Sequence, residues 1–381
     1  MQQPATDFSL TDRGPFDRVM RPRKPLILRA VLLALFAWLP LLVLALMARG
    51  EGPEPRISFA NDIAVHVRFL LVVPLLILAE GPIGERTRKV ANTFLSSGLV
   101  RPEDRGRFLE IVKKTSRRLE STLAEVAVLV LAVLAVSSMV RKLLHDGVVS
   151  WSEHVEGGVE HLSPAGWWYV VMTPVVAFLF LRWVWRFATW CWFLRQVSRL
   201  DLHLVATHAD RAAGLGFVNL GQNAFAAIPL AASCVIAAHV GTEILQTGTE
   251  LGTYKHALIA FVVMSILVGM LPAPIFFKTL ARTKRAAQVA YGDLSARYSQ
   301  AFEAKWMSGE PGSEELLGSG DFQSLADLGG AFERLDAMRP SPLDKRTAIA
   351  FALAAALPML PLVLTVMPLN DIVKMLMKAV V

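Results

Sequence analysis

Charged residues are scarce in this chain. Only 19% of its 381 residues are Asp, Glu, Lys or Arg, whereas 54% are hydrophobic and the mean hydropathy is +0.46. An ordinary soluble domain carries about 25% charged residues, so this chain has too few to cover a water-facing surface. Its hydrophobic residues gather in blocks, several of which exceed the roughly 20 residues needed to cross a bilayer. The composition excludes a soluble enzyme, a disordered chain and a disulfide scaffold, and it predicts a polytopic membrane protein.

Cysteines and catalytic motifs are also few. The two cysteines, Cys191 and Cys234, fall inside apolar blocks, and no Cys-x-x-Cys pair or Cys/His ligand spacing accompanies them. The sequence contains no P-loop, HExxH, GxSxG or GxGxxG pattern. We therefore expect neither a cofactor nor an enzymatic activity.

The apolar blocks predict an all-α bundle with about seven transmembrane helices and additional cytoplasmic amphipathic helices. The predicted spans are Ile27–Ala48, Asp62–Glu80, Ser121–Val140, Trp167–Leu194, Gln222–Leu245, His256–Leu280 and Thr347–Pro368. The second span is the weakest, because Asp62, His66 and Arg68 leave an apolar run of only Phe69–Ala79. We expect it either to cross the bilayer or to form a re-entrant or tilted interfacial helix.

Lys and Arg alternate between the connections. The predicted cytoplasmic segments carry many Lys and Arg residues: five in 1–26, ten in 81–120, three in 195–221 and nine in 281–346. The other connections carry few: two in 49–61, two in 141–166, one in 246–255 and two in 369–381. Excess positive charge marks the cytoplasmic side of a membrane protein. The net charge of +7 therefore reports orientation and does not indicate nucleic-acid binding. We expect a bacterial inner-membrane protein with a cytoplasmic N-terminus.

The same pattern predicts the organisation of the chain. A basic cytoplasmic N-terminus (1–26) precedes a first transmembrane pair (27–80), and a cytoplasmic helical segment (81–120) precedes the central bundle (121–280). The cytoplasmic segment 281–346 contains an amphipathic helix, Arg282–Trp306, a polar loop and a second helix, Phe322–Met338. The last part (347–381) combines the seventh span with an interfacial helix at Leu369–Val381, where Lys374 and Lys378 lie four residues apart beside apolar side chains.

Proline occurs inside six of the seven predicted spans: Pro40, Pro74, Pro174, Pro229, Pro272 with Pro274, and Pro358 with Pro361. Each proline removes a backbone hydrogen bond and tends to kink its helix. Kinked helices are common along transport pathways, although proline is generally frequent in membrane helices. The pattern favours a conduit over a simple anchor.

Ionisable residues within the spans form two predicted levels. The outer level contains Asp62, His66, Arg68, His239, Glu243 and His256, and the inner level contains Glu80, Glu125, Arg182, Arg186 and Lys278. A charge in hydrocarbon is expensive unless it is paired or faces water. We expect Arg182 and Arg186 to snorkel to the headgroups, and Glu125 to form an ion pair with Arg182 or Lys278 or to act in a proton relay. The candidate transport residues are His66, Arg68, His239 and Glu243 outside, and Glu80 and Glu125 inside.

Two connections carry further candidate residues. The external loop 141–166 contains His145, His154 and His161 with several carboxylates, which suit a divalent metal or a pH sensor, but their spacing matches no ligand template. We expect these histidines to be solvated in the loop, and the sequence does not indicate which metal, if any, the protein binds. The cytoplasmic turn 207–217 contains His208, Asp210 and Arg211 among glycines. It is expected to be either a structural turn packed under the bundle or a gate that binds an anion.

These features support a channel or transporter for an ion or small solute as the first hypothesis. The alternative is a non-catalytic scaffold or sensor whose basic cytoplasmic helices bind a partner protein or anionic lipid. An intramembrane enzyme that acts on lipid is a third class. The expected partners are membrane lipids and a second copy of the chain in a homo-oligomer. A conduit should contain a polar cavity, whereas a scaffold should be dry with each buried charge paired.

Overall fold

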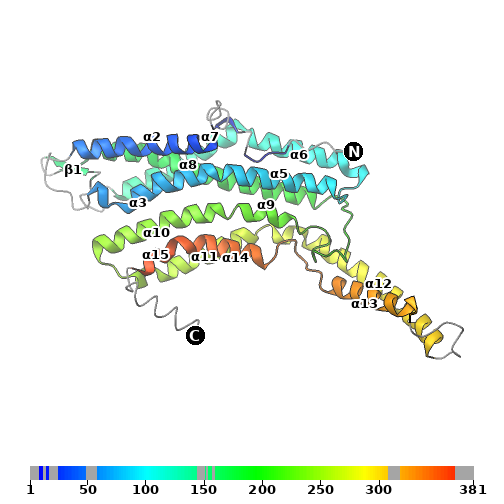
Figure 1. The fold of residues 1–381 in the computed structure, drawn as a ribbon. Helices are drawn as coiled ribbons and strands as arrows, with labels where there is room; N and C mark the ends of the chain where they lie inside the picture. Colours follow the sequence, from blue (N-terminus) through cyan, green and yellow to red (C-terminus); the bar gives the residue numbers. More distant parts are fainter. Residues whose placement is uncertain are drawn as a thin grey trace.

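The computed structural model describes residues 8–11, 14–16, 25–48, 58–143, 151, 153–156, 159–307 and 318–364. Its helices lie side by side in an elongated bundle, from which one helical hairpin projects (Figure 1). The all-α prediction is confirmed for the described residues, apart from one short β-hairpin.

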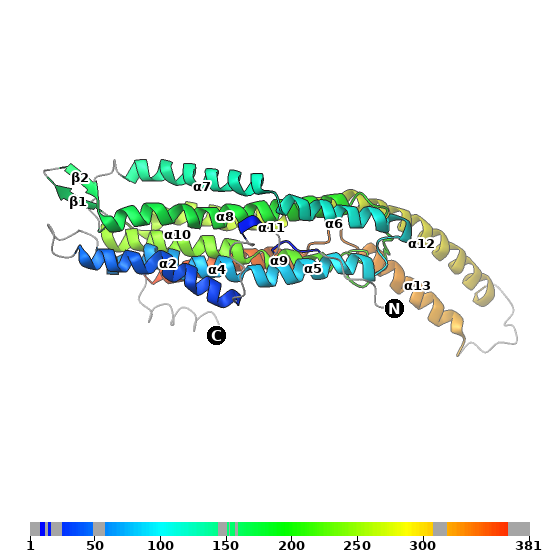
Figure 2. The ribbon, with the colours of Figure 1, turned by 90° about the horizontal axis from the view of Figure 1, so that it is seen from above.

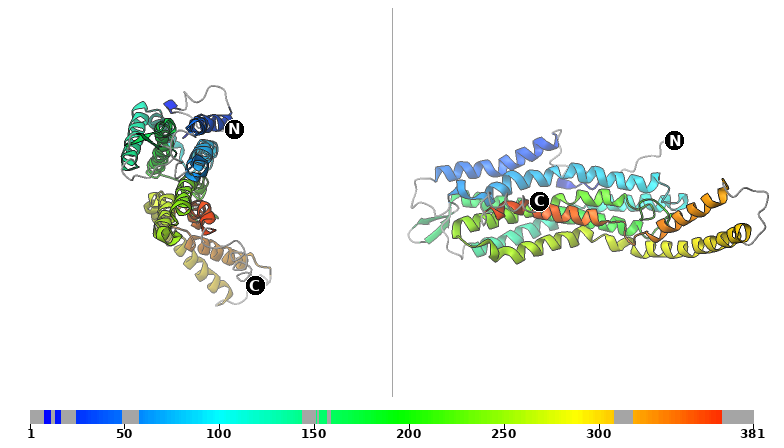
Figure 3. Two further views of the ribbon diagram at one scale, coloured as in Figure 1. Left: turned by 90° about the vertical axis from the view of Figure 1, so that its left-hand side faces the viewer. Right: turned by 60° about the horizontal axis from the view of Figure 1, so that its bottom comes forward.

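The first group of helices is built around the long helix α8, which α2, α4, α6 and α7 all contact. The left panel of Figure 3 shows this group end-on, at the top. Its members are α2 (Leu26–Met47), α3 (Ile63–His66), η2 (Val67–Val72), α4 (Val73–Leu78), α5 (Glu80–Ser96), α6 (Arg105–Leu119), α7 (Thr122–Leu143) and α8 (Pro164–Val197). Short 3₁₀ turns at Phe59–Asn61 (η1) and Pro102–Asp104 (η3) precede α3 and α6.

The second group is joined to the first by α10, which packs against α3, η2 and α4, and by α9, which packs against α5. Its members are α9 (Val218–Ala224), α10 (Ala227–Thr247), η4 (Leu251–Tyr254), α11 (Lys255–Met270), η5 (Ala273–Phe276), α14 (Lys345–Ala356), η6 (Leu357–Met359) and α15 (Leu360–Val363). The projecting hairpin consists of α12 (Phe277–Trp306) and α13 (Gly320–Asp336). We call this hairpin the arm.

Six helical segments of the described chain are long and apolar enough to cross a membrane: Leu26–Met47, Ile63–Ser96, Pro164–Val197, Val218–Thr247, Leu251–Trp306 and Lys345–Val363. The predicted third span differs, because α7 meets the same criterion only together with the preceding helix Pro102–Leu119, across a bend of 44°. The described chain therefore has six such helices, or seven if this bent pair counts as one.

Several of these helices are longer than the hydrocarbon core of a bilayer is thick. A helix of 34 residues, such as Pro164–Val197, is about 51 Å long, compared with about 30 Å of hydrocarbon. The extensions α5 and α6 lie at the same end of the bundle as the arm, and the β-hairpin lies at the other end (Figures 1 and 2). The described helices of two segments predicted to be cytoplasmic, 81–120 and 281–346, therefore share one end.

The predicted second span is part of the helical segment Ile63–Ser96, so it does not turn back as a re-entrant helix would. Residues Val67–Val72 form a π-helical segment within it. Pro74 follows in the first turn of α4 and has no N–H with which to continue the regular α-helical pattern. Short π-helical segments often occur at functional sites, and this one contains Arg68.

The connection 141–166, which was predicted to be external, contains secondary structure that was not predicted from the sequence. Strands β1 (Glu153–Glu156) and β2 (Val159–Leu162) pair antiparallel, with Glu156 opposite Val159. The signal was present, because a Gly-Gly dipeptide between two such segments is typical of a tight hairpin. His145 of the predicted histidine cluster and the predicted interfacial helix Leu369–Val381 lie outside the described residues, as do the last residues of the seventh predicted span.

Large apolar side chains point outward along the bundle instead of being confined to its core. Among the exposed ones are Phe36 and Leu39 on α2, Leu131 and Leu134 on α7, and Met264, Leu267 and Leu271 near the end of α11. Apolar patches of this extent are rare on soluble monomers and mark an interface or a membrane-facing surface.

Candidate functional site: a buried charge network beneath the N-terminal segment

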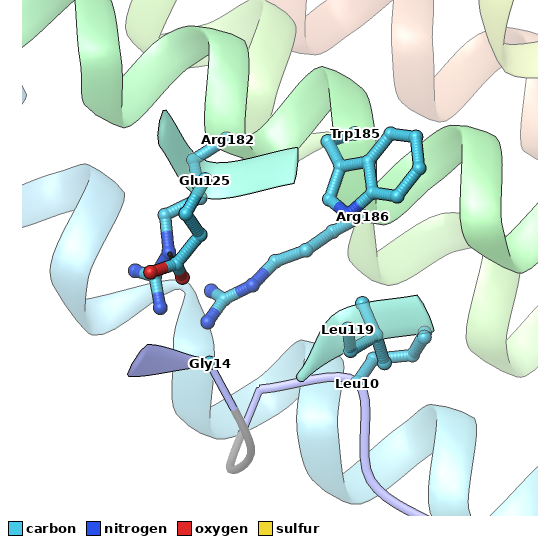
Figure 4. Close-up of a pocket in the computed structure, with 7 residues that line it drawn as sticks. All are labelled: Leu10, Gly14, Leu119, Glu125, Arg182, Trp185 and Arg186. Carbon is cyan, nitrogen blue, oxygen red and sulfur yellow. Dashed lines mark ion pairs between the residues drawn. The ribbon is translucent and has the colours of Figure 1, made fainter. Parts of the chain in front are cut away.

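Four charged side chains from three helices meet inside the first group of helices (Figure 4 shows three of them). Arg182 and Arg186 of α8 each place an Nη1 atom 3.0 Å from Oε1 of Glu80, the first residue of α5. Arg182 Nε also lies 3.6 Å from Oε1 of Glu125, near the start of α7. The four side chains are between 4% and 13% exposed. We call this set the charge network.

Helix geometry explains why these residues meet. Arg182 and Arg186 are four residues apart and therefore lie on one face of α8. Glu80 lies about 25 Å along its helical segment from Ile63, and Arg182 lies about 27 Å along α8 from Pro164, so both reach the same level of the bundle. The predicted pairing of Glu125 with Arg182 is confirmed. The predicted snorkelling of Arg182 and Arg186 is wrong, because a buried carboxylate already pairs with both guanidinium groups.

The N-terminal segment covers the charge network. The backbone N–H of Phe16 donates a hydrogen bond of 2.8 Å to Oε2 of Glu125, and Arg186 Nη2 donates one of 3.3 Å to the carbonyl oxygen of Thr11. The guanidinium carbon of Arg182 lies 4.8 Å from the centre of the Phe16 ring. The backbone of this segment therefore donates a hydrogen bond to Glu125 and accepts one from Arg186.

Residues 8–11 are themselves buried in a groove of the bundle. The Phe8 ring packs 4.7 Å from the ring of Phe193, and its carbonyl oxygen accepts a hydrogen bond from Arg88 Nε. Thr11 fits against Gly84, where a Cβ atom would lie only 2.2 Å from the Thr11 hydroxyl. From the sequence this region was expected to be a basic cytoplasmic tail, and the apolar residues Phe8 and Leu10 were the available signal that it packs.

The space left around the charge network is small. A cavity of about 10 Å³ is lined by Leu10, Gly14, Leu119, Glu125, Arg182, Trp185 and Arg186. A water molecule needs roughly this volume. The two predicted inner transport residues, Glu80 and Glu125, are thus brought together. Among the described residues they pair with two arginines, and the cavity beside them has room for about one water molecule.

The predicted outer residues lie in two separate places, His66 and Arg68 on one helical segment and His239 and Glu243 on α10. His66 accepts a hydrogen bond of 2.9 Å at Nδ1 from Trp38 Nε1, and Arg68 donates one to the hydroxyl of Tyr169. His239 and Glu243 lie on α10, 3.7 Å apart, with side chains 67% and 40% exposed. Among the described residues, no hydrogen bond or ion pair joins one pair to the other. The structure therefore does not assemble the single outer site that was predicted.

An aromatic cluster surrounds the first of these pairs. Rings of Phe59 and His66 lie 5.0 Å apart, and Trp151 lies 5.0 Å from Phe59 on its other side. Trp151 Nε1 donates a hydrogen bond of 3.0 Å to Oδ2 of Asp62.

The turn that contains Asp210 is wrapped around its carboxylate. Oδ1 accepts hydrogen bonds from the N–H groups of Ala212 and Gly214, and Oδ2 accepts one of 2.8 Å from Gly216. Nδ1 of His208 lies 2.9 Å from Oδ1. Burial favours the neutral acid, but these hydrogen bonds outweigh it and hold the pKa of Asp210 below its ordinary value.

This turn is also the joint between the bundle and the arm. Its backbone is left-handed at Arg211 and Ala213, with φ of 56° and 55°, which is strained for residues other than glycine. Arg339, which follows the arm, donates from its N–H to the carbonyl of Arg211 at 2.7 Å and from Nη2 to that of Asp210 at 3.0 Å. Arg211 therefore contributes to the joint through its left-handed backbone and its carbonyl oxygen.

Replacing Asp210 by Asn is expected to destabilise this turn by about 1–3 kcal/mol at pH 7, because Asn offers one acceptor oxygen in place of two. The folded-state pKa of Asp210 is lowered, so its contribution is present above the unfolded pKa of about 3.9 and is lost as the pH falls through the lower folded pKa. Hydrogen exchange of Ala212, Gly214 and Gly216 should be faster in the variant at pH 7, with the difference shrinking below about pH 4. Asp201→Asn is the control, since that side chain is 73% exposed; equal exchange in both variants would contradict the assignment.

Metal ligands do not gather in the described part of the chain. No group of three His, Cys, Asp or Glu side chains there is arranged to hold a metal ion. Comparison with known proteins finds no matching family model, no matching curated protein and no matching solved structure. The function is therefore inferred from the chemistry and geometry of the residues themselves.

Proposed function

We propose that this chain is a multi-pass protein of the bacterial inner membrane, with its N-terminus and arm in the cytoplasm. Six helices of sufficient length and apolar character support this proposal, as do the outward-facing apolar side chains. The described Lys- and Arg-rich helices α5, α6 and α12 lie toward the end of the bundle from which the arm projects. This arrangement follows the positive-inside rule.

Cysteine accessibility tests this topology. Gly106 in α6 and Gly252 in η4 belong to segments at opposite predicted sides, and each has open space where a Cβ atom would be added. In a background with Cys191 and Cys234 replaced by Ala, we expect a membrane-impermeant maleimide added to intact cells to label Gly252→Cys and to leave Gly106→Cys unlabelled until the cells are lysed. Labelling of Gly106→Cys in intact cells would contradict the orientation.

We further propose that the protein is a non-catalytic membrane scaffold or sensor. The observation that carries this proposal is the closed charge network, in which two acids and two bases pair with one another beneath the N-terminal segment. A conduit would need such residues to face water. Pairing leaves them a structural role, which is to fix α5, α7 and α8 to one another at the cytoplasmic end.

The arm is the part of the scaffold that we propose to contact a protein partner. Lys284 of α12 donates to the carbonyl oxygens of Asp336 and Met338, which fixes the base of the hairpin. The rings of Phe302 and Phe322 lie 4.8 Å apart near its tip. The hydrogen bonds that Lys305 and Trp306 donate to Asp321 also hold the pKa of that carboxyl below its ordinary value. Two antiparallel helices anchored at both ends form a stiff extension.

Apolar side chains remain exposed on this stiff extension. Val289 of α12 is 67% exposed and Phe332 of α13 is 37% exposed. The antiparallel contacts place these two residues at about the same level of the hairpin. Exposed apolar residues on a rigid surface are typical of protein–protein contact sites. The basic residues Lys113, Lys114 and Arg117 on α6 are exposed as well, and they suit anionic headgroups at the cytoplasmic membrane surface.

Site-specific photocrosslinking in cells tests the role of the arm. A photoreactive residue at Val289 should give an adduct of discrete mass with one protein, and the same residue at the exposed polar position Gln300 should give much less. Phe332→Asp should abolish the adduct at Val289 while the amount of protein in the membrane is unchanged. No discrete adduct, or one that is insensitive to Phe332→Asp, would contradict the proposal.

A conduit formed between copies of the chain is the second candidate. The observation that favours it is the exposed pair His239 and Glu243 on the apolar helix α10. In a homo-oligomer, such polar side chains would face a neighbouring copy or a water-filled path. The loss of a measured flux on replacement of His239 by Ala, with no loss on replacement of Glu125 by Gln, would distinguish this candidate from a conduit within one chain.

A further inference from the structure

Arg68 is a buried cation without an acidic partner in the described chain. It is 8% exposed and lies in the π-helical segment Val67–Val72. Its contacts are a hydrogen bond to the Tyr169 hydroxyl and the face of the same ring, whose centre lies 5.5 Å from the guanidinium carbon. No carboxylate of the described residues lies within ion-pairing distance of it. A phenol and its ring are neutral and cannot balance the charge.

The position of Arg68 makes this imbalance important. It follows Ile63 by five residues, about 8 Å along the helical segment Ile63–Ser96, and an apolar run from Phe69 to Ala79 follows it. An uncompensated arginine within a membrane helix is costly, even on the insertion scales that give the lowest values. An anion beside Arg68 would remove much of this penalty.

An apolar slot begins within one helical turn of Arg68. This cavity, of about 50 Å³, lies between α2, the η2–α4 segment and α8 and is lined by Leu33, Phe36, Ala37, Phe69, Val73, Met172, Val175 and Val176. Phe69 follows Arg68 directly, and Met172 lies one turn beyond Tyr169. The lining also includes Val73 and Val176, each one turn farther along its helix than Phe69 and Met172.

We propose that Arg68 and this slot bind one anionic phospholipid, with its phosphate at the Arg68 guanidinium and the Tyr169 hydroxyl and with the first methylene groups of one acyl chain in the slot. Arginine matches the geometry of phosphate oxygens and forms charge-assisted hydrogen bonds with them. The apolar walls favour the burial of methylene groups. Both halves of the site are thus filled by one molecule that a bilayer supplies. This proposal rests on the membrane location proposed above, which the cysteine-labelling experiment tests separately.

Native mass spectrometry of the full chain in mild detergent tests the proposal. The probes are phosphatidylglycerol and phosphatidylcholine with identical acyl chains, added at equal concentrations, together with inorganic phosphate. We expect the wild-type protein to retain phosphatidylglycerol about tenfold more tightly than phosphatidylcholine. Both lipids carry the phosphate, but the choline ammonium of phosphatidylcholine cancels its net charge and is repelled by the Arg68 guanidinium. Inorganic phosphate at the same concentration should not displace phosphatidylglycerol, because phosphate has no chain for the slot.

Three variants separate the two halves of the site. Arg68→Gln should remove the preference for phosphatidylglycerol, and Arg68→Lys should keep part of it. Val175→Phe fills the slot from a half-buried position and should weaken the binding of both lipids. Lys255→Gln, which removes an exposed cation at the start of α11, is the control and should bind as the wild type does. The proposal would be overturned if the wild-type protein retained both lipids equally or if phosphate alone displaced the lipid. It would also be overturned by an unchanged lipid preference in Arg68→Gln or by unchanged lipid binding in Val175→Phe.

Discussion

Replacing Glu80 by Gln is expected to lower the free energy of unfolding by about 3 kcal/mol, because removal of one member of a buried ion pair leaves the remaining charge uncompensated. The carboxylate of Glu80 accepts from both Arg182 and Arg186. In the variant, the carboxylate of Glu125, at 3.6 Å from Arg182, would be the remaining acid of the charge network. Equilibrium unfolding in mixed detergent micelles, followed by circular dichroism, measures the effect.

Glu85→Gln is the matched control for this measurement. Glu85 lies on the same helix and is exposed, so the same chemical change there should alter the free energy of unfolding by no more than about 0.5 kcal/mol. Replacing Arg186 by Met together with Glu80→Gln should cost less than the sum of the two single changes, since each single change leaves an unpaired charge. Equal stability of Glu80→Gln and Glu85→Gln would show that the charge network does not hold the helices together.

Gly269→Ala is expected to lower the free energy of unfolding by about 1–3 kcal/mol through overpacking. A Cβ atom at Gly269 would lie 2.5 Å from Cγ of Phe351 and hardly farther from two other ring atoms. Phe351 is 1% exposed at the contact between α11 and α14, so its ring has little room to move. The carbonyl of Gly269 also accepts a hydrogen bond from Gln222, which ties the position to α9. The same unfolding assay measures the loss.

Gly292→Ala is the control for backbone effects. Gly292 lies in the interior of α12 with nothing within 4 Å of the added Cβ. Alanine should there stabilise the helix by about 1 kcal/mol. The free energy of unfolding is thus expected to fall for Gly269→Ala and to rise for Gly292→Ala. This difference separates the effect of packing from that of helix propensity. A Gly269→Ala variant as stable as the wild type would mean that α11 and α14 are not in close contact.

The helices were the part of the fold that could be predicted from sequence. Apolar runs of about 20 residues, such as Leu26–Met47, indicate a helix without reference to the rest of the chain. The arm was predicted nearly to its ends, because amphipathic spacing and the flanking Gly- and Pro-rich segments mark both helices. The hairpin of β1 and β2 was missed despite a Gly-Gly dipeptide, since the strands are only four residues long.

The charge network could be predicted only in part. The spacing of Arg182 and Arg186 places both on one face of α8, but it cannot show that Glu80, about a hundred positions earlier, lies at the same level. The docking of the N-terminal segment is likewise a long-range contact of an irregular piece of chain, for which no periodic pattern exists. The left-handed backbone at Arg211 and Ala213 was not foreseen either, because such conformations normally select glycine.

The pairing of buried charges changes the interpretation of the ionisable residues in the spans. Glu80 and Glu125 were expected to line an aqueous path, and the structure joins them to two arginines beneath a buried segment. In the proposed scaffold, this network holds α5, α7 and α8 together near the end of the bundle that carries the arm. Arg339 then connects the turn around Asp210 to the arm, so the arm is anchored to a rigid base.

Ion and proton flux in proteoliposomes tests the closed interior most directly. Purified wild-type protein, reconstituted at a series of protein-to-lipid ratios, should show no flux of protons, potassium or chloride above that of empty vesicles. Protein-dependent flux that disappears in Glu80→Gln or Glu125→Gln would place the charge network on a permeation path and would contradict a scaffold with a closed interior.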